Sequence, residues 1–469
     1  MLRDTMAEHV VTPEDFMSVS PPARMIGIEC EYNLQTDGLG ARSYVTADII
    51  RSAGIKSHGS YLGNGGKLYV DVGDHPEYDT PECLGPRQVT IYKHAGVLVM
   101  QDIIGASNLP HRGLYLHAGT TIRRPGNITT TKTSGTHKNY LAPRQVTNSE
   151  LIDRLLPGHL ATRMYAMGGK VGERYEYSQK AQGIGGTAIT RLVNRRTDHG
   201  NKPMVMIPPS GDDIDTIGNA DWARVEVRLA DPVMSPVGEF MDTATTSLVL
   251  RLIEHPHLIS PHLAEAVELA EPAQAAKIFS RDLHWKAAVT TVTGKQASWL
   301  SVQRAYAEAV AMLPEFIELP EDELDAIDRW VEFCDLAALA EPLEAEYGVL
   351  ANQYDFAARH SYLAKKVGIA SIRCDNPNAV QRSLLWDRIT PTGGSLLYWQ
   401  HQPNPIYTNE EVQTAKSTAP PTRALIRASV INGNDSDNRV STWAHVARMK
   451  QPNIVLADSY ETNIPAALL

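Results

Sequence analysis

Apolar and polar residues alternate along several short runs, a period of two that is typical of strands burying one face. The runs "ARMIGIECEYNL", "GKLYVDV", "RGLYLHAGTTI" and "DWARVEVRLADP" show this pattern and predict β-strands. Elsewhere apolar residues recur every three to four positions, which indicates helices. The expected helices lie at 46–54, 87–107, 148–167 and 235–256, and the stretch from about 260 to 370 is expected to be almost wholly helical.

The predicted strands and helices do not alternate in a regular βαβ rhythm, so the fold class is predicted to be α+β. Residues 1–22 are polar and are expected to form a flexible leader. Residues 23–407 form the predicted main domain, which closes with a turn-rich segment at 388–407. Residues 408–469 are predicted to form a small C-terminal domain.

Composition adds a few limits to this picture. With 469 residues, 43% of them hydrophobic, the chain can bury a sizeable core. Its net charge of -10 argues against non-specific nucleic-acid binding, which needs a basic surface. The four cysteines are scattered, without a CxxC pair, and no apolar run is long enough for a signal peptide or a membrane span. A cytoplasmic protein with reduced thiols is therefore expected.

Three of the predicted strands carry charged or phenolic side chains at alternate positions, which point to one face of a strand. These are Glu29 and Glu31, Tyr69 and Asp71, and Arg224, Glu226 and Arg228. One such strand is typical of any sheet with a solvated face. Three together predict bound cations, because several carboxylates on one face repel each other. Mg²⁺ prefers oxygen ligands and guanidinium groups suit phosphate, so the pattern indicates metal-nucleotide chemistry.

The same segments resemble known signatures. "RVEVRLADP", "GIECEY" and "SGTHKNYL" resemble metal-binding segments of the glutamine synthetase superfamily. A closer resemblance is to the Pup ligase and Pup deamidase/depupylase family (PafA and Dop), which shares the glutamine synthetase-like fold. "KLYVDVGDHPEYDTPEC" is similar to the active-site strand of that family, and "GTHKNYL", "YSQKAQGI", "AKSTAPPTRALIR" and "STWAHV" support the match. The resemblance implies a curved antiparallel sheet backed by helices, with catalytic residues in the main domain.

The resemblance also implies roles for single residues. Asp71 corresponds to the catalytic aspartate of the family. The implied metal ligands are Glu29, Tyr69, Glu77, His137 and Glu226, and the implied contacts to ATP or its phosphates are Lys67, Thr80, Arg196, Arg228 and Trp443.

The implied reaction joins the C-terminal glutamate of Pup, a small ubiquitin-like modifier, to a lysine of a target protein, with ATP and Mg²⁺. A carboxylate is a poor electrophile, and phosphorylation by ATP would activate it as a glutamyl phosphate. Asp71 would then deprotonate the attacking lysine. Membranes and nucleic acids are not expected partners.

Other functions stay open at this point. The alternatives are a Pup deamidase or depupylase, a ligase of the same chemistry acting on a small amino acid or peptide, and a paralogue that only binds nucleotide or Pup. Members of the depupylase branch carry a long insertion between the first metal strand and the aspartate strand. Glu29 and Asp71 are only 42 positions apart (71 − 29), which favours the ligase branch.

The chain departs from the family pattern in several places, which indicates a divergent member. Lys138 stands where the family has a glutamate, and is expected either to be solvated or to occupy a lost metal-site position. Lys67 replaces an arginine, and the segment "NRRTDHGN" around Arg196 is altered. The run "GNGGK" before the aspartate strand could cradle phosphate or form a turn, and Trp443 could instead be a core aromatic.

Overall fold

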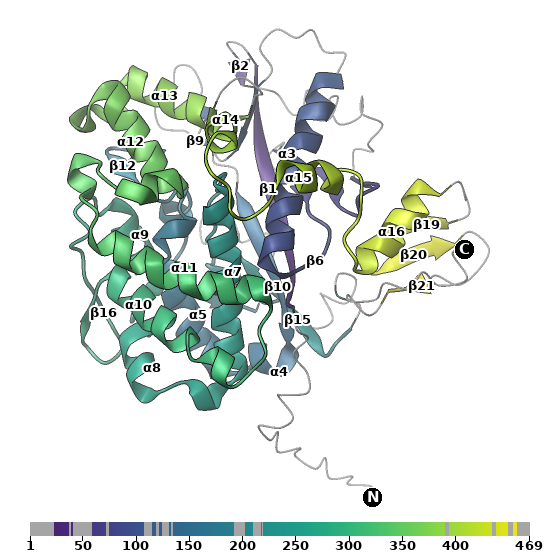
Figure 1. The fold of residues 1–469 in the computed structure, drawn as a ribbon, viewed down its shortest axis with the longest axis horizontal. Coiled ribbons are helices and arrows are strands. Elements are labelled where there is room, and N and C mark those ends of the chain that lie inside the picture. The colour runs from purple at the N-terminus through teal and green to yellow at the C-terminus, as the bar shows by residue number, and fades with distance from the viewer. Residues whose placement is uncertain are drawn as a thin grey trace, which may run out of the picture.

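The computed structural model describes residues 23–36, 39–40, 59–71, 75–106, 115–118, 122–123, 131–132, 135–191, 202–209, 217, 219–389, 394–433, 438–448 and 454–456. The predicted leader, the predicted helix at 46–54 and Arg196 lie outside these residues. The described elements form a sheet covered by helices, with a small C-terminal unit at one end (Figure 1).

The long strand β1 (Met25–Thr36) runs through the centre of a twelve-stranded sheet. On one side of β1 lie β10 (Thr136–Pro143), β15 (Trp222–Val227), β14 (Val205–Met206) and β13 (Ile189–Thr190). On the other side lie β5 (His75–Asp79), β4 (Lys67–Asp71) and β3 (Ser60–Tyr61). The strands along this path pair antiparallel, except that β13 and β14 are parallel. Three of the four predicted strands are β1, β4 and β15, and the fourth contains β7 (Tyr115–Ala118), which pairs with the far end of β1.

The two faces of β1 differ as the alternation predicts. Ile26, Ile28, Cys30 and Tyr32 are buried in the main core, whereas Glu29 and Glu31 are partly exposed on the other face. Helices α3 (Gly85–Ala106) and α7 (Pro236–Glu254) pack on each other and against β1 and β10 on the apolar side (Figure 1). The helix α7 begins where predicted, because Ser235 Oγ accepts a hydrogen bond from the Gly238 N–H.

The predicted helical stretch is mostly helical, but a two-stranded hairpin of β16 (Val289–Thr290) and β17 (Gln296–Ala297) interrupts it, which the sequence did not predict. It contains α8 (Pro261–Val267), α9 (Pro272–Arg281), α10 (Trp299–Val310), α11 (Glu321–Ala338) and α12 (Asp355–Val367), and α13 (Pro377–Asp387) follows it. The helix predicted at 148–167 is α5 (Glu150–Thr162), which gives way to a single 3₁₀ turn at Met164–Ala166. The segment 388–407 is more ordered than expected, with β18 (Arg388–Ile389) and α14 (Gly394–Gln400). Burial of Leu396 and Trp399 explains this helix, and the Trp399 indole donates to Asp355 Oδ1 at 2.9 Å.

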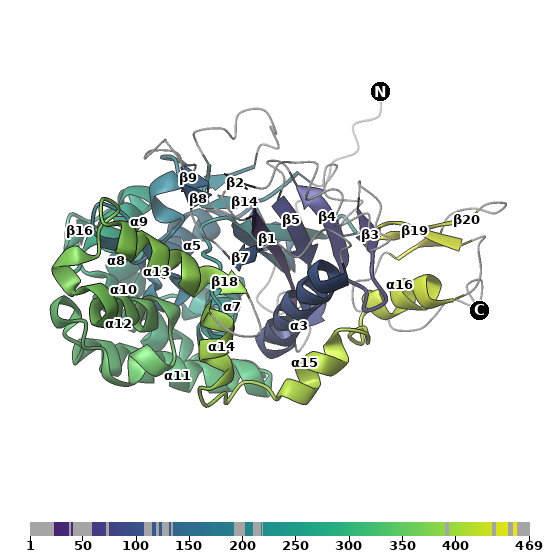
Figure 2. The same ribbon diagram turned by 90° about the horizontal axis from the view of Figure 1, so that it is seen from above.

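The C-terminal unit consists of α16 (Arg423–Asn432) and a three-stranded sheet of β19 (Asn438–Thr442), β20 (His445–Arg448) and β21 (Ile454–Val455). It has a small core of its own, made by Ile426, Val446 and Leu456. Figure 2 shows it beyond β3 and β4, at the end of the molecule opposite the helices α8 to α13. Helix α15 (Asn409–Ala415) packs instead on α3, so the division of the chain at residue 408 stays a prediction.

Across the part of the chain that the structure describes, every helix is too short or too polar to cross a membrane.

Candidate functional site

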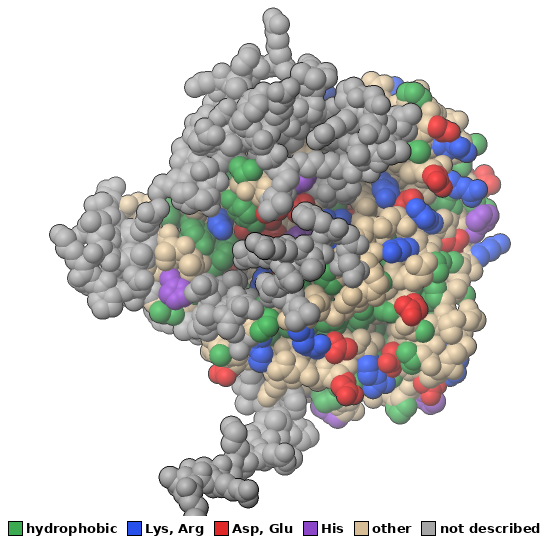
Figure 3. Space-filling model, turned by 180° about the vertical axis from the view of Figure 1, so that it is seen from behind, with side chains coloured by type: hydrophobic (Ala, Val, Ile, Leu, Met, Phe, Trp, Pro, Cys, Tyr) green, Lys and Arg blue, Asp and Glu red, His purple; other side chains and the backbone are tan. Residues whose placement is uncertain are grey.

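The register of the sheet gathers polar side chains on the face opposite α3 and α7. Glu29 of β1 lies opposite His137 of β10 and Asp79 of β5, and Glu31 lies opposite Glu77. Because opposed residues in paired strands share a face, these side chains come together although they are distant in sequence. Acidic and histidine side chains lie together in a hollow of the molecular surface in Figure 3.

A first acidic group consists of Glu29, His137 and Glu226, whose candidate ligand atoms all lie within 4.8 Å of one another. His137 Nδ1 lies 2.9 Å from Glu29 Oε2, and Asn139 Nδ2 donates to Glu29 Oε1 at 3.0 Å. Arg224 Nη1 lies 2.9 Å from Glu226 Oε2. Burial opposes ionisation of Glu29, but the hydrogen bond to His137 and the charges of His137 and Arg224 lower its pKa to about 2. Glu29 is therefore ready to bind a cation at neutral pH.

A second acidic group consists of Glu31, Asp71 and Glu77, again with candidate ligand atoms within 4.8 Å. Burial, together with Asp79 and the other nearby carboxylates, raises the pKa of Glu77 well above its usual range. Glu77 Oε2 and Asp79 Oδ1 are buried and have no hydrogen-bond partner among the described residues. Buried polar atoms are nearly always satisfied, so this arrangement fits a bound cation with oxygen ligands.

The Lys180 loop, residues 177–184, brings the charge of Lys180 near Glu31 of this second group. Burial opposes ionisation of Glu31, but Lys180 and His137 lower its pKa overall, and its Oε2 also accepts from the Gly135 N–H at 2.6 Å. The loop is held by Asp231, which accepts hydrogen bonds from the backbone N–H groups of 168, 179 and 180 and from Ser178 Oγ. Asp231 therefore holds the backbone of the segment "YSQKAQGI", residues 177–184, in place.

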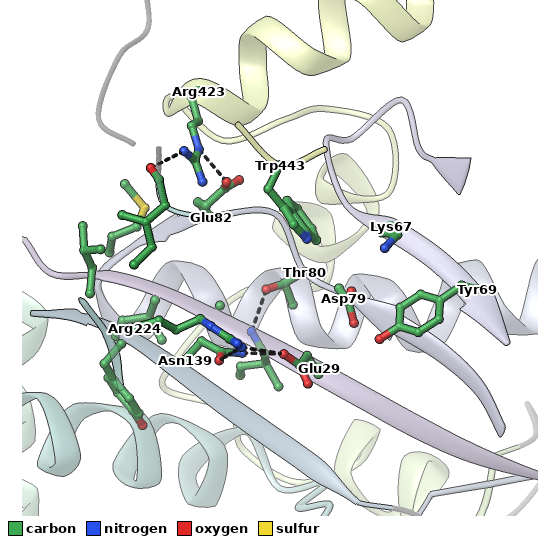
Figure 4. A pocket seen from close by; sticks show the side chains of 17 residues that line it. Glu29, Lys67, Tyr69, Asp79, Thr80, Glu82, Asn139, Arg224, Arg423 and Trp443 are labelled. Atoms are coloured by element: carbon green, nitrogen blue, oxygen red, sulfur yellow. Dashed lines mark hydrogen bonds and ion pairs between the residues drawn. The ribbon is translucent and has the colours of Figure 1, made fainter. Parts of the chain in front are cut away.

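A cavity of about 240 Å³ opens beside the first acidic group. Its walls come from β1, β4, β5, β10, β15 and the C-terminal unit, and Glu29 lies at the boundary between the cavity and the acidic group (Figure 4). Thr80 Oγ1 accepts a hydrogen bond from the Ile28 N–H at 2.9 Å, which fixes Thr80 in the wall. Lys67 Nζ lies 4.6 Å from the centroid of the Tyr69 ring. Lys67, Tyr69, Thr80 and Trp443 all line the cavity.

The C-terminal unit is attached at the cavity by Glu82. This carboxylate pairs with Arg423, whose Nε lies 2.8 Å from Oε1, and with both terminal nitrogens of Arg427. Arg427 also donates to the Trp443 carbonyl at 2.9 Å, and its guanidinium lies 4.8 Å from the Trp443 ring centroid. Glu82 therefore fixes Trp443 in the cavity wall (Figure 4).

The structure brings nearly all the predicted site residues to this one face. They are Glu29, Lys67, Tyr69, Asp71, Glu77, Thr80, His137, Glu226, Arg228 and Trp443. Arg228 Nε lies 3.2 Å from Glu226 Oε1, whereas Arg196 lies outside the described residues. The roles of these residues in binding and catalysis stay predictions.

Sequence reasoning missed several residues that the site contains: Asp79, Glu82, Asn139, Arg224 as a partner of Glu29, Arg423 and Arg427. Asp79 could have been predicted, because it lies two positions from Glu77 and therefore on the same face of β5. The spacing of four between Arg423 and Arg427 indicates one face of a helix. Their pairing with Glu82, however, joins residues more than 340 positions apart and has no local signal.

Both expectations for Lys138 are wrong. Adjacent residues of a strand point to opposite faces, so Lys138 lies on the core side of β10, away from His137. Its side chain is fully buried and pairs with Glu239 and Asp242 of α7. The run "GNGGK" forms a turn, with a hydrogen bond from the Leu62 N–H to the Gly66 carbonyl. The turn packs against α16: a Cβ on Gly65 would lie 2.8 Å from the Ala424 Cβ.

Comparison with known proteins places the chain among similar sequences and folds. The family model described as "Pup-ligase protein" matches residues 18–447. The Pup--protein ligase of Paenarthrobacter aurescens is 25% identical over 459 residues, covering 90% of this chain and 92% of the relative. That of Acidimicrobium ferrooxidans is 27% identical over 327 residues, covering 66% and 67%.

Two solved structures share the fold. The complex between the ubiquitin-like protein Pup and its ligase PafA has a TM-score of 0.80 at 21% identity and covers 96% of this chain and 92% of the ligase. The ligase PafA in complex with ADP has a TM-score of 0.72 at 19% identity, with coverage of 91% and 92%. The predicted α+β fold class is confirmed.

Replacing Glu82 by Gln should loosen the C-terminal unit from the sheet. Burial opposes ionisation of Glu82, but Arg427 and Arg423 lower its pKa to about 2, below the 4.5 of a free glutamate. A lowered pKa means that the stabilisation is complete above pH 4.5 and is lost as the pH falls toward 2. The substitution removes the one negative charge that pairs with both buried guanidinium groups in the part of the chain that the structure describes, which costs about 3 kcal/mol or more.

Hydrogen exchange measured by mass spectrometry should show this loss as lower protection of α16 and β20, that is, faster exchange relative to the intrinsic rate at the same pH. The lower protection is expected in Glu82→Gln at neutral pH, and in the wild-type protein between about pH 4.5 and 2. The control is Glu265→Gln, which removes an exposed ion pair with Lys295 in the helical part and should leave α16 unchanged. Equal exchange of α16 in Glu82→Gln and the wild type would show that Glu82 does not hold the unit.

Proposed function

Because the chain belongs to the Pup ligase family, we propose that it joins the C-terminal glutamate of a Pup-like protein to lysine side chains of target proteins, using ATP. The observation that carries this proposal is the polar sheet face. It sets two acidic groups side by side and next to a cavity, with Asp71 in one of them. A cytoplasmic location, where ATP is available and thiols stay reduced, accompanies the proposal.

The donor set on this face fits Mg²⁺. Glu29, His137 and Glu226 would hold one ion, and Glu31 and Glu77 would supply oxygen ligands to another. The unpartnered Glu77 Oε2 and Asp79 Oδ1 support this assignment. When bound, Mg²⁺ neutralises charge on the phosphoryl group that is transferred.

The phenol of Tyr69 also faces these carboxylates. Its pKa is raised by burial and by the nearby charges of Asp79, Glu77 and Glu29. The phenol therefore stays neutral at physiological pH and would act as a neutral oxygen donor toward the cation or as a hydrogen-bond donor to Glu77.

The nucleotide would occupy the cavity, with its base toward Trp443 and its phosphates toward Glu29. Three observations favour this orientation. Trp443 offers an aromatic surface at the wall formed by the C-terminal unit, and Lys67 supplies a cation on β4. Arg224 and Arg228 flank Glu226 at the other end, where guanidinium groups can stabilise phosphate oxygens.

Asp71 would accept the proton from the attacking lysine. It lies at the end of β4, partly exposed, so an incoming side chain can reach it. Its neighbours Glu31 and Glu77 make the surroundings acidic, which attracts an ammonium group before deprotonation. A lysine must lose its proton to attack the glutamyl phosphate, so the side chain of Asp71 has a defined task.

Asp71→Asn should lower the rate of conjugation about 100-fold or more, because an amide cannot take the proton. The assay combines the purified protein, ATP, Mg²⁺, a Glu-ended Pup and a lysine-bearing acceptor, and follows the conjugate by gel shift. ADP binding by the variant should remain, since Asp71 does not line the cavity. Asp375→Asn, which alters an exposed aspartate paired with Arg373, serves as the matched control and should behave like the wild type.

A reverse assay with a pre-formed conjugate and with Gln-ended Pup separates the alternatives. Cleavage or deamidation without any conjugate formation would contradict the ligase proposal and favour a hydrolase. ATP hydrolysis without either reaction on Pup would leave the ATP chemistry in place and contradict Pup as the substrate.

A further inference from the structure

A buried cluster of five charged side chains lies behind the first acidic group, on the core side of the sheet. The back cluster, as we name it, consists of Lys93 of α3, Lys138 of β10, Arg163 at the end of α5, and Glu239 and Asp242 of α7. None of the five is more than 3% exposed. None of the roles proposed above for binding or catalysis uses them.

Lys138 is at the centre of the back cluster. Its Nζ lies 2.5 Å from Glu239 Oε1 and also pairs with Asp242. Lys93 Nζ lies 3.4 Å from the other oxygen of Glu239, and Arg163 pairs with Asp242. Glu239 and Asp242 are thus each shared between Lys138 and one further cation, so Lys138 links the two halves of the cluster.

The position of Lys138 in β10 connects this cluster to the other face of the sheet. Its two chain neighbours, His137 and Asn139, point to the polar face and both bind the carboxylate of Glu29. Lys138 itself lies opposite Ile28 of β1 and Val227 of β15. A strand cannot shift at one residue without moving both neighbours, so the anchor on α7 fixes how far His137 and Asn139 project.

The other cations of the cluster hold the chain that follows β15. Arg163 donates to the carbonyl of Leu229, and Lys93 donates to the carbonyl of Val233. This segment contains Asp231, which holds the Lys180 loop, and it directly follows Arg228. The back cluster therefore fixes both β10 and the end of β15 to the same turns of α7.

We propose that Lys138 is a positioning residue that sets the affinity of the Glu29–His137–Glu226 group for a divalent cation. It does so by tying β10 to α7, which keeps His137 and Asn139 within hydrogen-bond distance of the Glu29 carboxylate. Groups that orient metal ligands from behind commonly change metal affinity by 10- to 100-fold. The inference rests on the proposed function only for the presence of a cation site and is independent of the protein substrate.

The charges of the back cluster explain why a cation stands at position 138. With Lys138 the cluster has three cations and two carboxylates, and each carboxylate has two cationic neighbours. A glutamate at 138 would add a third carboxylate and leave two cations, with like charges in contact inside the core. Lys138, Glu239 and Asp242 are therefore a matched set of charges, and Lys138 keeps the strand anchored.

The test is Mn²⁺ binding by the full chain without nucleotide, followed by electron paramagnetic resonance of the free ion. Lys138→Met keeps most of the unbranched side chain and removes its charged end, and should weaken Mn²⁺ binding about tenfold or more. The matched control is Arg251→Met, which breaks the buried pair with Glu323 near the other end of α7. It should lower the melting temperature comparably and leave Mn²⁺ binding unchanged.

Asp242→Asn provides a milder variant in case Lys138→Met does not fold, and it should weaken Mn²⁺ binding in the same direction. Unchanged Mn²⁺ affinity in the folded Lys138 or Asp242 variant would overturn the proposal, as would an equal loss in Arg251→Met. Conjugation by the wild type separates the proposed ligase function from the proposed positioning role of Lys138. If it occurs while the Lys138 variant binds Mn²⁺ normally, the ligase function stands and the positioning role falls. If the wild type binds no Mn²⁺, both the cation site and the role of Lys138 are wrong.

Discussion

The pairing of β1 with β10 on one side and β5 on the other is the constraint on which the rest of the site depends. It places Glu29 between His137 and Asp79, and Glu31 opposite Glu77. A slip of one residue would turn one strand's carboxylates into the core and its apolar residues into the site. The buried row of Ile26, Ile28, Cys30 and Tyr32 prevents that slip, because it must remain beneath α3. Core packing on one face thus defines the chemistry of the other.

Charge balance is the second condition, and each face of the sheet meets it differently. On the polar face His137 and Arg224 keep Glu29 ionised, while burial and the carboxylates around Glu77 raise the pKa of Glu77. That difference favours a site completed by a metal ion over a closed network of ion pairs. On the core face the charges are paired within the protein, as Lys138 shows. One face of β10 therefore contributes to a site that is open to ligands, and the other face carries a buried anchor.

Much of this organisation could be predicted from the sequence, because it follows from alternation along single strands. The faces of Glu29 and Glu31 and of Arg224 and Glu226 needed only a period of two. The contacts that could not be predicted join distant segments: Glu82 with Arg427, and Lys138 with Glu239. The prediction for Lys138 was wrong because it was made from the motif that contains His137. The alternation along the strand places Lys138 on the opposite face. The helix α14 was not predicted because the glycines and prolines at 388–407 indicate turns. Burial of Leu396 and Trp399, which depends on distant segments, stabilises the helix.

We propose that the polar face activates the carboxylate of the substrate through an acyl phosphate. The most direct test replaces the lysine acceptor with hydroxylamine, which attacks a glutamyl phosphate and releases inorganic phosphate. The account predicts that wild-type protein, ATP, Mg²⁺ and Glu-ended Pup yield a hydroxamate at the C-terminal glutamate, detected by mass spectrometry, with one ADP formed for each. ADP formation without hydroxamate, or a hydroxamate that forms without ATP, would contradict it.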